Sequence, residues 1–337
     1  MFSQLLVFFA LQGCEPQTQS ALIPRPTDTS TVTATGVTTS TGTTTVVGTA
    51  DTGVEPEPLD CSILPPMPAT YQTLTGYSTA EDFDFNAAGY LIAVVSSNLS
   101  AKNQAGDVQI ISPGVGNWTS GTRTLATGDY VVAVPGEGTI VLVDGVTGGQ
   151  VPITGGLSYP NGVEVDSQNN VYYADQSTAI LGRINAYDNT DYEIISTGMT
   201  GGNGVILSPD EQTIYVGSFT DGKIWAVDRD PSGVGWLDKR VIFESPSWDS
   251  GYDGINVDAC GNVYWTEYIT GKVRRVTPDG SQVDLVANLP SSWIPNMRWG
   301  NDIDGWDSNL LYVSDRDQGR LFALDVGIPG KKHITVP

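Results

Sequence analysis

The chain has 337 residues, of which 39% are hydrophobic and 39 are glycine. This composition supplies enough apolar material for a large core and is typical of a turn-rich β protein with little helix. The 38 acidic residues against 16 basic ones give a formal net charge of −22, and a surface this negative repels phosphate backbones, which argues against nucleic acid as a partner.

The first residues are typical of an export signal. Residues 5–11 form an apolar stretch too short to span a bilayer, and Leu11-Gln12-Gly13-Cys14 resembles a bacterial lipobox. We predict a lipoprotein signal peptide over residues 1–14, a lipid on Cys14, and an extracytoplasmic protein on the outer membrane or cell surface of a bacterium. The membrane would then be contacted only through this anchor. The basic residue that usually precedes such a stretch is missing, so an ordinary secretory signal is the alternative.

Residues 15–68 are predicted to be a disordered linker. Thr27–Thr52 is rich in threonine and Glu55-Pro56-Glu57-Pro58 follows it, so bulky apolar residues are too few to build a core. Cys61 lies near the end of this linker and Cys260 lies in a turn of the folded part. An oxidising compartment permits a disulfide between them, but the spacing is equally consistent with two unpaired thiols.

A short phrase recurs along the rest of the chain, and each copy begins with an oxygen-bearing side chain. The copies are EDFDFN from Glu81, NGVEVD from Asn161, NGVILS from Asn203, DGINVD from Asp253 and NDIDGW from Asn301. Each is followed by a polar turn and a second alternating run such as NVYYAD or LLYVSD. Units of roughly 40 to 50 residues built from short strands are the signature of a β-propeller with about four strands per blade.

Residues 69–337 are therefore predicted to form an all-β, six-bladed β-propeller. The interval between Glu81 and Asn161 leaves room for one more unit, whose head we expect near Thr127–Asp129 without an obvious ligand. A stretch near Tyr71–Tyr77 is expected to add the strand that closes the ring against the last blade.

Blades arranged around an axis would bring the heads of the phrases to one point. Carboxylate and amide oxygens are hard ligands that suit calcium or magnesium, so the repeat predicts a cation site on the axis. The alternative is structural: Asn-Gly and Asp-Gly pairs cap strands with turns, and an ion would then only hold the blades together.

These phrases resemble the six-bladed propellers of the regucalcin/gluconolactonase (senescence marker protein/gluconolactonase/luciferin-regenerating-enzyme-like) family, most closely in GGNGVILSPDEQTIYVG from Gly201 and YDGINVDACGNVYWTE from Tyr252. The resemblance implies a divalent cation at the channel mouth, usually Ca²⁺, with Mg²⁺, Mn²⁺ or Zn²⁺ as alternatives. It assigns the ligands Glu81, Asn161, Asn203 and Asp253. Asn301 is expected to be a further ligand or to donate a hydrogen bond to one of them.

The resemblance also implies a gluconolactonase-like hydrolase of lactones or related esters, in which the cation acts as a Lewis acid and Asp253 accepts a proton from water. We expect a monomer acting on a small lactone or ester. Histidine chemistry has little support, because His333 is the single histidine and is expected to be a solvated tail residue. The family's substrate-binding arginine is replaced by Tyr159. This departure favours the alternative, a non-catalytic, metal-stabilised propeller that binds a ligand or an envelope protein.

Overall fold

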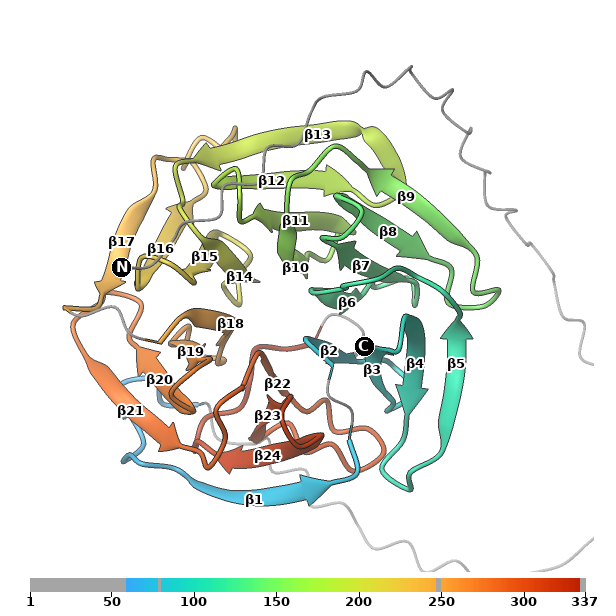
Figure 1. Ribbon diagram of the computed structural model, residues 1–337. Helices are drawn as coiled ribbons and strands as arrows, with labels where there is room; N and C mark the ends of the chain where they lie inside the picture. The colour runs from blue at the N-terminus through green and yellow to red at the C-terminus, as the bar shows by residue number, and fades with distance from the viewer. Residues whose placement is uncertain (1–58, 78–79, 247–249, 334–337) are drawn as a thin grey trace, which may run out of the picture. The chain divides into compact units, whose positions relative to one another are not determined.

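Short antiparallel strands make up the structure, a computed structural model that describes residues 59–77, 80–246 and 250–333. These residues form 24 strands and no helix. The strands make six four-stranded sheets around one axis (Figure 1), so the predicted all-β, six-bladed β-propeller is confirmed. The predicted signal peptide, Cys14 and the linker as far as residue 58 lie outside the described residues. The described part of the chain has no helix long and apolar enough to traverse a membrane.

Blades 1 to 3 are formed by consecutive strands that run from the axis outward. Blade 1 contains β2 (Phe83–Phe85), β3 (Leu91–Val95), β4 (Asn98–Lys102) and β5 (Val108–Ser112). Blade 2 contains β6 (Thr122–Thr124), β7 (Tyr130–Val134), β8 (Thr139–Val143) and β9 (Gln150–Thr154). Blade 3 contains β10 (Pro160–Val165), β11 (Asn170–Asp175), β12 (Ile180–Asn185) and β13 (Asp188–Thr197).

Blades 4 and 5 follow the same plan, and blade 6 takes its outermost strand from the N-terminal side of the described chain. Blade 4 contains β14 (Gly202–Leu207), β15 (Thr213–Ser218), β16 (Lys223–Asp228) and β17 (Arg240–Glu244). Blade 5 contains β18 (Tyr252–Val257), β19 (Val263–Glu267), β20 (Lys272–Val276) and β21 (Val283–Asn288). Blade 6 contains β22 (Met297–Trp299), β23 (Leu310–Asp315), β24 (Arg320–Asp325) and β1 (Thr70–Thr75).

The pairing of β1 with β24 closes the ring. The two strands are antiparallel, with Thr70 opposite Asp325 and Thr75 opposite Arg320. This confirms the predicted closing strand near Tyr71–Tyr77. Two distant parts of the sequence thus share one sheet, which joins the last blade to the beginning of the described chain.

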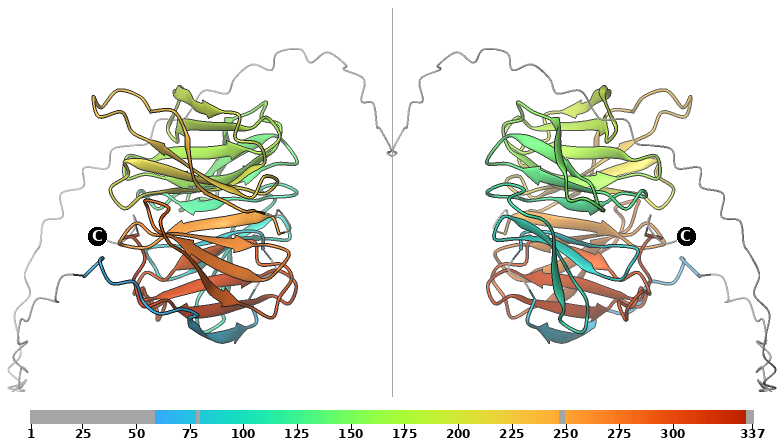
Figure 2. Two further views of the ribbon diagram at one scale, coloured as in Figure 1. Left: turned by 90° about the vertical axis from the view of Figure 1, so that its left-hand side faces the viewer. Right: turned by 90° about the vertical axis from the view of Figure 1, so that its right-hand side faces the viewer.

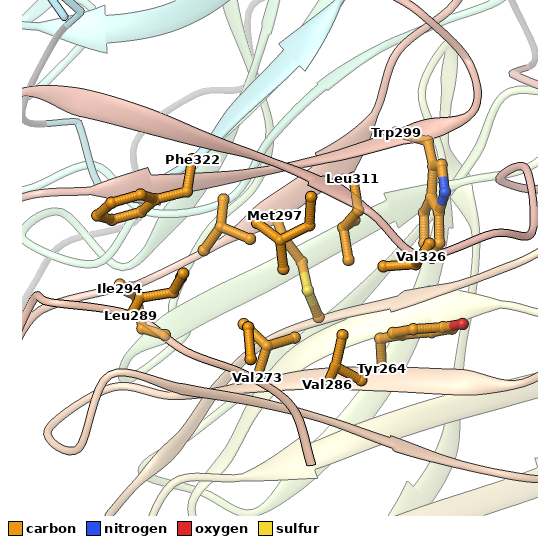
Figure 3. Packing of buried hydrophobic residues seen from close by; sticks show 13 residues of the cluster. Tyr264, Val273, Val286, Leu289, Ile294, Met297, Trp299, Leu311, Phe322 and Val326 are labelled. Atoms are coloured by element: carbon orange, nitrogen blue, oxygen red, sulfur yellow. The ribbon is translucent and has the colours of Figure 1, made fainter. Parts of the chain in front are cut away.

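Apolar side chains between neighbouring blades form the core. Six buried clusters fill the six junctions between blades. Figure 3 shows the cluster between blades 5 and 6, where Met297 and Leu311 of one blade face Val273 and Val286 of the other. The views of Figure 2 show the strands twisting across the thickness of the ring. Inner strands such as β10, β14 and β18 are buried on both faces, so they place side chains on the axis with little freedom to move.

A repeated turn explains why the phrases of blades 3 and 5 look alike. In blade 5, Asp258 accepts hydrogen bonds from the peptide N–H and side-chain amide of Asn262 and from the hydroxyl of Tyr264. Asp166 makes the same three bonds with Asn170 and Tyr172 in blade 3. One buried carboxylate therefore satisfies the donors of each turn between the first and second strands.

The linker boundary expected at Pro68 is corrected by contacts that begin at Cys61. Cys61 forms a disulfide with Cys260, 199 residues away, the pairing that the sequence left open. The peptide N–H of Ala69 donates to the carbonyl of Val286 at 2.8 Å, and Met67 packs against the cluster between blades 5 and 6. The segment from Cys61 onward is therefore attached to the propeller.

Candidate metal centre

Four of the predicted site residues lie at the start of inner strands. Asn161, Asn203 and Asp253 are each the second residue of β10, β14 and β18, and Glu81 lies two residues before β2. These inner strands occupy equivalent places around the axis (Figure 1). Their first residues therefore lie at the same mouth of the central channel.

A glycine follows Asn161, Asn203 and Asp253, and it allows neighbouring inner strands to approach each other. A Cβ atom on Gly162 would lie 2.1 Å from the carbonyl oxygen of Asn203, and one on Gly204 would lie 2.4 Å from that of Asp253. Neither glycine has a positive φ, and both are inside strands. The Asn-Gly and Asp-Gly pairs are therefore not turns, and the glycines are needed for close packing.

Asp253 is the most strongly perturbed carboxyl group of the site. Its residue is only 5% exposed. Burial raises the pKa of Asp253 well above its usual value, and the neighbouring charges of Glu81 and Asp82 raise it further. The neighbouring side chain of Asn203 acts to lower this pKa. Glu81, Asn203 and Asp253 therefore interact, although they come from three blades.

Glu81 lies at the edge of the same cluster and is partly exposed. Burial raises the pKa of Glu81, while an ion pair with Arg316 opposes the shift. Asn161 and Glu81 line one open pocket at the mouth, with a volume of about 380 Å³. This volume is in the range of small-molecule sites, so two of the four predicted ligands border a space that a substrate can enter.

Arg316 was missed in the sequence, although the repeat contains a signal for it. It follows directly after β23, as Gln176, Phe219 and Tyr268 follow the second strands of blades 3, 4 and 5. The peptide N–H groups of all four donate equivalent hydrogen bonds, to the carbonyls of Tyr159, Gly201, Gly251 and Trp293. Aligning the residue after each second strand would have placed Arg316 at the channel mouth.

Asn301 does not belong to this site, which corrects the prediction. It follows the far end of β22, whereas the other heads lie at the beginning of their strands. Its side chain donates to the carbonyl of Asn86 at 2.9 Å and accepts from the peptide N–H of Ile303. NDIDGW is thus a loop at the opposite end of the blade, where Asp302 and Asp304 have positive φ.

The head of blade 2 is also corrected. Residues Thr127–Asp129 form the turn between β6 and β7, so they do not lie at the mouth. The equivalent of Asn161 is Ser120, whose hydroxyl donates to the carbonyls of Pro160 and Asn161. The short polar segment from Ser120 to Thr124 lacked the apolar run by which the other heads were recognised.

A buried charge cluster lies deeper in the channel and was also missed. Glu164 accepts hydrogen bonds from Arg123 Nε at 3.0 Å, Arg298 Nη2 at 3.4 Å and Lys331 Nζ at 2.6 Å. Arg123 also pairs with Asp82. Burial raises the pKa of Asp82 to about 6, although Arg123 opposes the shift. We call Asp82, Arg123, Glu164, Arg298 and Lys331 the channel charge cluster.

His333 is not the solvated tail residue that we expected. Its Nε2 lies 3.0 Å from Oδ1 of Asp84, and its side chain is 17% exposed. Burial acts to raise the pKa of Asp84, but contacts with His333 and then Arg123 hold it below its usual value. His333 is therefore held against the inner strand of blade 1 and is not free in solvent.

The residues at the mouth suit a hard divalent cation. Within the ranges that the structure describes, no group of three or more His, Cys, Asp and Glu side chains is placed to hold a metal. A cation site therefore needs the amide oxygens of Asn161 and Asn203 beside the carboxylates of Glu81 and Asp253. Such a set of oxygens matches calcium or magnesium, and a bound cation would offset the burial and the repulsion that raise the pKa of Asp253.

Comparisons with known proteins agree with this architecture. Residues 175–316 match the family model described as the SMP-30/Gluconolactonase/LRE-like region. The chain is 28% identical over 117 residues to a curated gluconolactonase from Zymomonas mobilis subsp. mobilis. That match covers 32% of this chain and 32% of that protein's own length.

Solved structures match over most of the propeller. The calcium-binding protein regucalcin from Agrobacterium tumefaciens strain C58 has a TM-score of 0.60 and 17% identity, covering 77% of this chain and 96% of that chain. A gluconolactonase from Xanthomonas campestris has a TM-score of 0.60 and 19% identity, covering 79% and 98%. At these identities the likeness establishes the fold. This chain is therefore a six-bladed β-propeller, and its residues 175–316 match the SMP-30/Gluconolactonase/LRE-like region.

Proposed function

We propose that this protein is a divalent-cation-dependent hydrolase of lactones or related esters. The observation that carries the proposal is the equivalent placement of Glu81, Asn161, Asn203 and Asp253 at or just before the beginning of inner strands around one axis. A pocket opens beside Glu81 and Asn161. The family region includes Asn203 and Asp253, and similar proteins are named gluconolactonase.

Glu81, Asn161, Asn203 and Asp253 would hold the cation, preferably Ca²⁺. When bound, the cation would supply Lewis-acid polarisation of the ester carbonyl and a lowered pKa of water. The side chain of Asn203 lies beside the carboxylate of Asp253 and favours its charged form. The carboxylate of Asp253 accepts the proton of the attacking water, and its buried position keeps this oxygen in one place.

The proposal is tested by a panel of lactones and aryl esters, incubated with the full-length protein in calcium and after chelation. We expect turnover of at least one lactone in calcium and its loss on chelation, with calcium binding measured separately by calorimetry. Binding of calcium without turnover of any substrate would contradict the hydrolase. It would favour the non-catalytic propeller that binds a ligand or an envelope protein.

We also propose that the protein is a monomer, lipid-anchored through Cys14 outside the bacterial cytoplasm. The disulfide between Cys61 and Cys260 supports this location, because such bonds persist in oxidising compartments. In a bacterial host, we expect labelled palmitate to be incorporated into the wild-type protein and not into Cys14→Ser. Equal labelling of the two proteins would exclude Cys14 as the lipidation site.

A further inference from the structure

The pocket beside the candidate metal centre has two unlike walls. It is lined by Glu81, Ser97, Trp118, Tyr159, Asn161 and Arg316, among others, and we call it the mouth pocket. One wall is an exposed tryptophan on the loop between blades 1 and 2. The other holds a guanidinium group from blade 6. A ligand that touches both walls must combine an apolar ring face with a group that arginine binds.

Trp118 is held in place over the mouth pocket although it is exposed. The residue is 78% exposed, and its φ of +59° lies in the left-handed region that large side chains rarely adopt. Its loop is fixed to the hairpin of blade 1, because Ser97 Oγ donates to Asn117 Oδ1 at 3.1 Å and the peptide N–H of Val115 donates to the carbonyl of Ser97 at 2.8 Å. An exposed aromatic surface kept in a strained conformation beside a site is suited to stacking on a ligand ring.

Arg316 is positioned from two sides. Its peptide N–H donates to the carbonyl of Trp293 at 2.9 Å, and the ring of Trp293 is stacked on that of Tyr268 with an interplanar angle of 2°. The guanidinium group of Arg316 forms an ion pair with the carboxylate of Glu81. The side chain is 44% exposed, so the guanidinium group is accessible from the mouth pocket.

Charge indicates what Arg316 binds. Glu81 and Arg316 are the two charged residues among those found to line the mouth pocket. A divalent cation held by Glu81 and Asp253 would balance both carboxylates and leave the charge of Arg316 without compensation. The chain as a whole carries −22 and repels anions, so an anionic ligand needs a local cation of this kind. A guanidinium group offers a carboxylate two parallel hydrogen bonds.

We propose that the mouth pocket selects a cyclic ester bearing a carboxylate, with the carboxylate on Arg316 and one face of the ring on Trp118. This inference rests on the proposed lactone hydrolysis and names its substrate class. The two residues act differently: Arg316 recognises the substituent, whereas Trp118 recognises the ring that charged and neutral lactones share.

The test uses two matched probes, 5-oxotetrahydrofuran-2-carboxylate and γ-valerolactone, which share a ring and carry a carboxylate or a methyl group. Dissociation constants are measured in calcium by saturation-transfer NMR, and kcat and KM are measured where turnover occurs. The wild type should prefer the carboxylate probe, and Arg316→Gln should reduce this preference by roughly tenfold or more. Trp118→Ala should weaken the binding of both probes and keep the ratio of their dissociation constants. Trp118→Phe should bind both probes more tightly than Trp118→Ala.

Two controls separate this effect from a change in total charge or in folding. Arg240→Gln removes the same charge from β17, the outermost strand of blade 4, and should keep the wild-type preference. The urea midpoint of every variant is compared with that of the wild type. The proposal would be overturned if Arg316→Gln lost affinity for both probes equally. It would also be overturned if the wild type bound the carboxylate probe no more tightly than γ-valerolactone. Discrimination between the probes without hydrolysis would support the subsite and contradict the proposed function, so the two failures are distinguishable.

Discussion

Asp253→Asn should lower kcat/KM for the best lactone by about a hundred- to ten-thousandfold, the range that a positioned proton acceptor contributes. Asparagine has nearly the same shape as aspartate, so the packing of the inner strand is preserved. It cannot take a proton from water, and it removes one of the two carboxylates that would hold the cation. Calcium affinity, measured by calorimetry, should therefore fall together with the rate.

A matched control lies at the other end of the same strand. Asp258 follows β18, is fully buried and stabilises the turn to β19. Asp258→Asn should reduce stability but keep the kcat/KM of the folded protein. If Asp253→Asn turned over substrate as fast as the wild type, Asp253 would not be the proton acceptor. If both variants lost activity with loss of fold, the Asp253 result would not support its proposed role.

Glu164→Gln should lower the free energy of unfolding by about 3–5 kcal/mol, the cost of breaking a buried ion pair by removing one partner. The carboxylate of Glu164 contacts Arg123, Arg298 and Lys331. Neutral glutamine leaves these cations in the channel with less negative charge beside them. Urea-induced unfolding, followed by tryptophan fluorescence, measures the change.

The comparison is with an exposed ion pair of the same chain. Arg183 and Asp191 are 2.6 Å apart, and the side chain of Asp191 is 49% exposed, so Asp191→Asn should lower the free energy of unfolding far less than Glu164→Gln. Adding Lys331→Met to Glu164→Gln should recover part of the loss, because an unbalanced cation is removed with its partner. A Glu164→Gln effect as small as that of Asp191→Asn would mean that solvent reaches the channel charge cluster.

The repeated phrases were sufficient to predict the ring and the position of most heads. Asn161, Asn203 and Asp253 are the second residues of six-residue inner strands, and their common phase within the repeat indicated one end of the channel. Blades 2 and 6 were harder, because β6 and β22 have only three residues each. Because these strands are so short, their phase could not be read from the sequence. Thr127–Asp129 and Asn301 were therefore assigned to the mouth, although they lie in a turn and a loop elsewhere.

The sequence by itself thus determined the all-β class, the number of blades, the closing strand and the phase of the candidate ligands, since strand periodicity and turn chemistry are local properties. The tertiary structure decided the rest. Arg316 meets Glu81, Lys331 meets Glu164 across 167 residues, and Cys61 meets Cys260. These pairs are placed by closure of the ring, which brings six inner strands to one axis. No local pattern encodes which charges from different blades become neighbours there, because that depends on the packing of every blade between them.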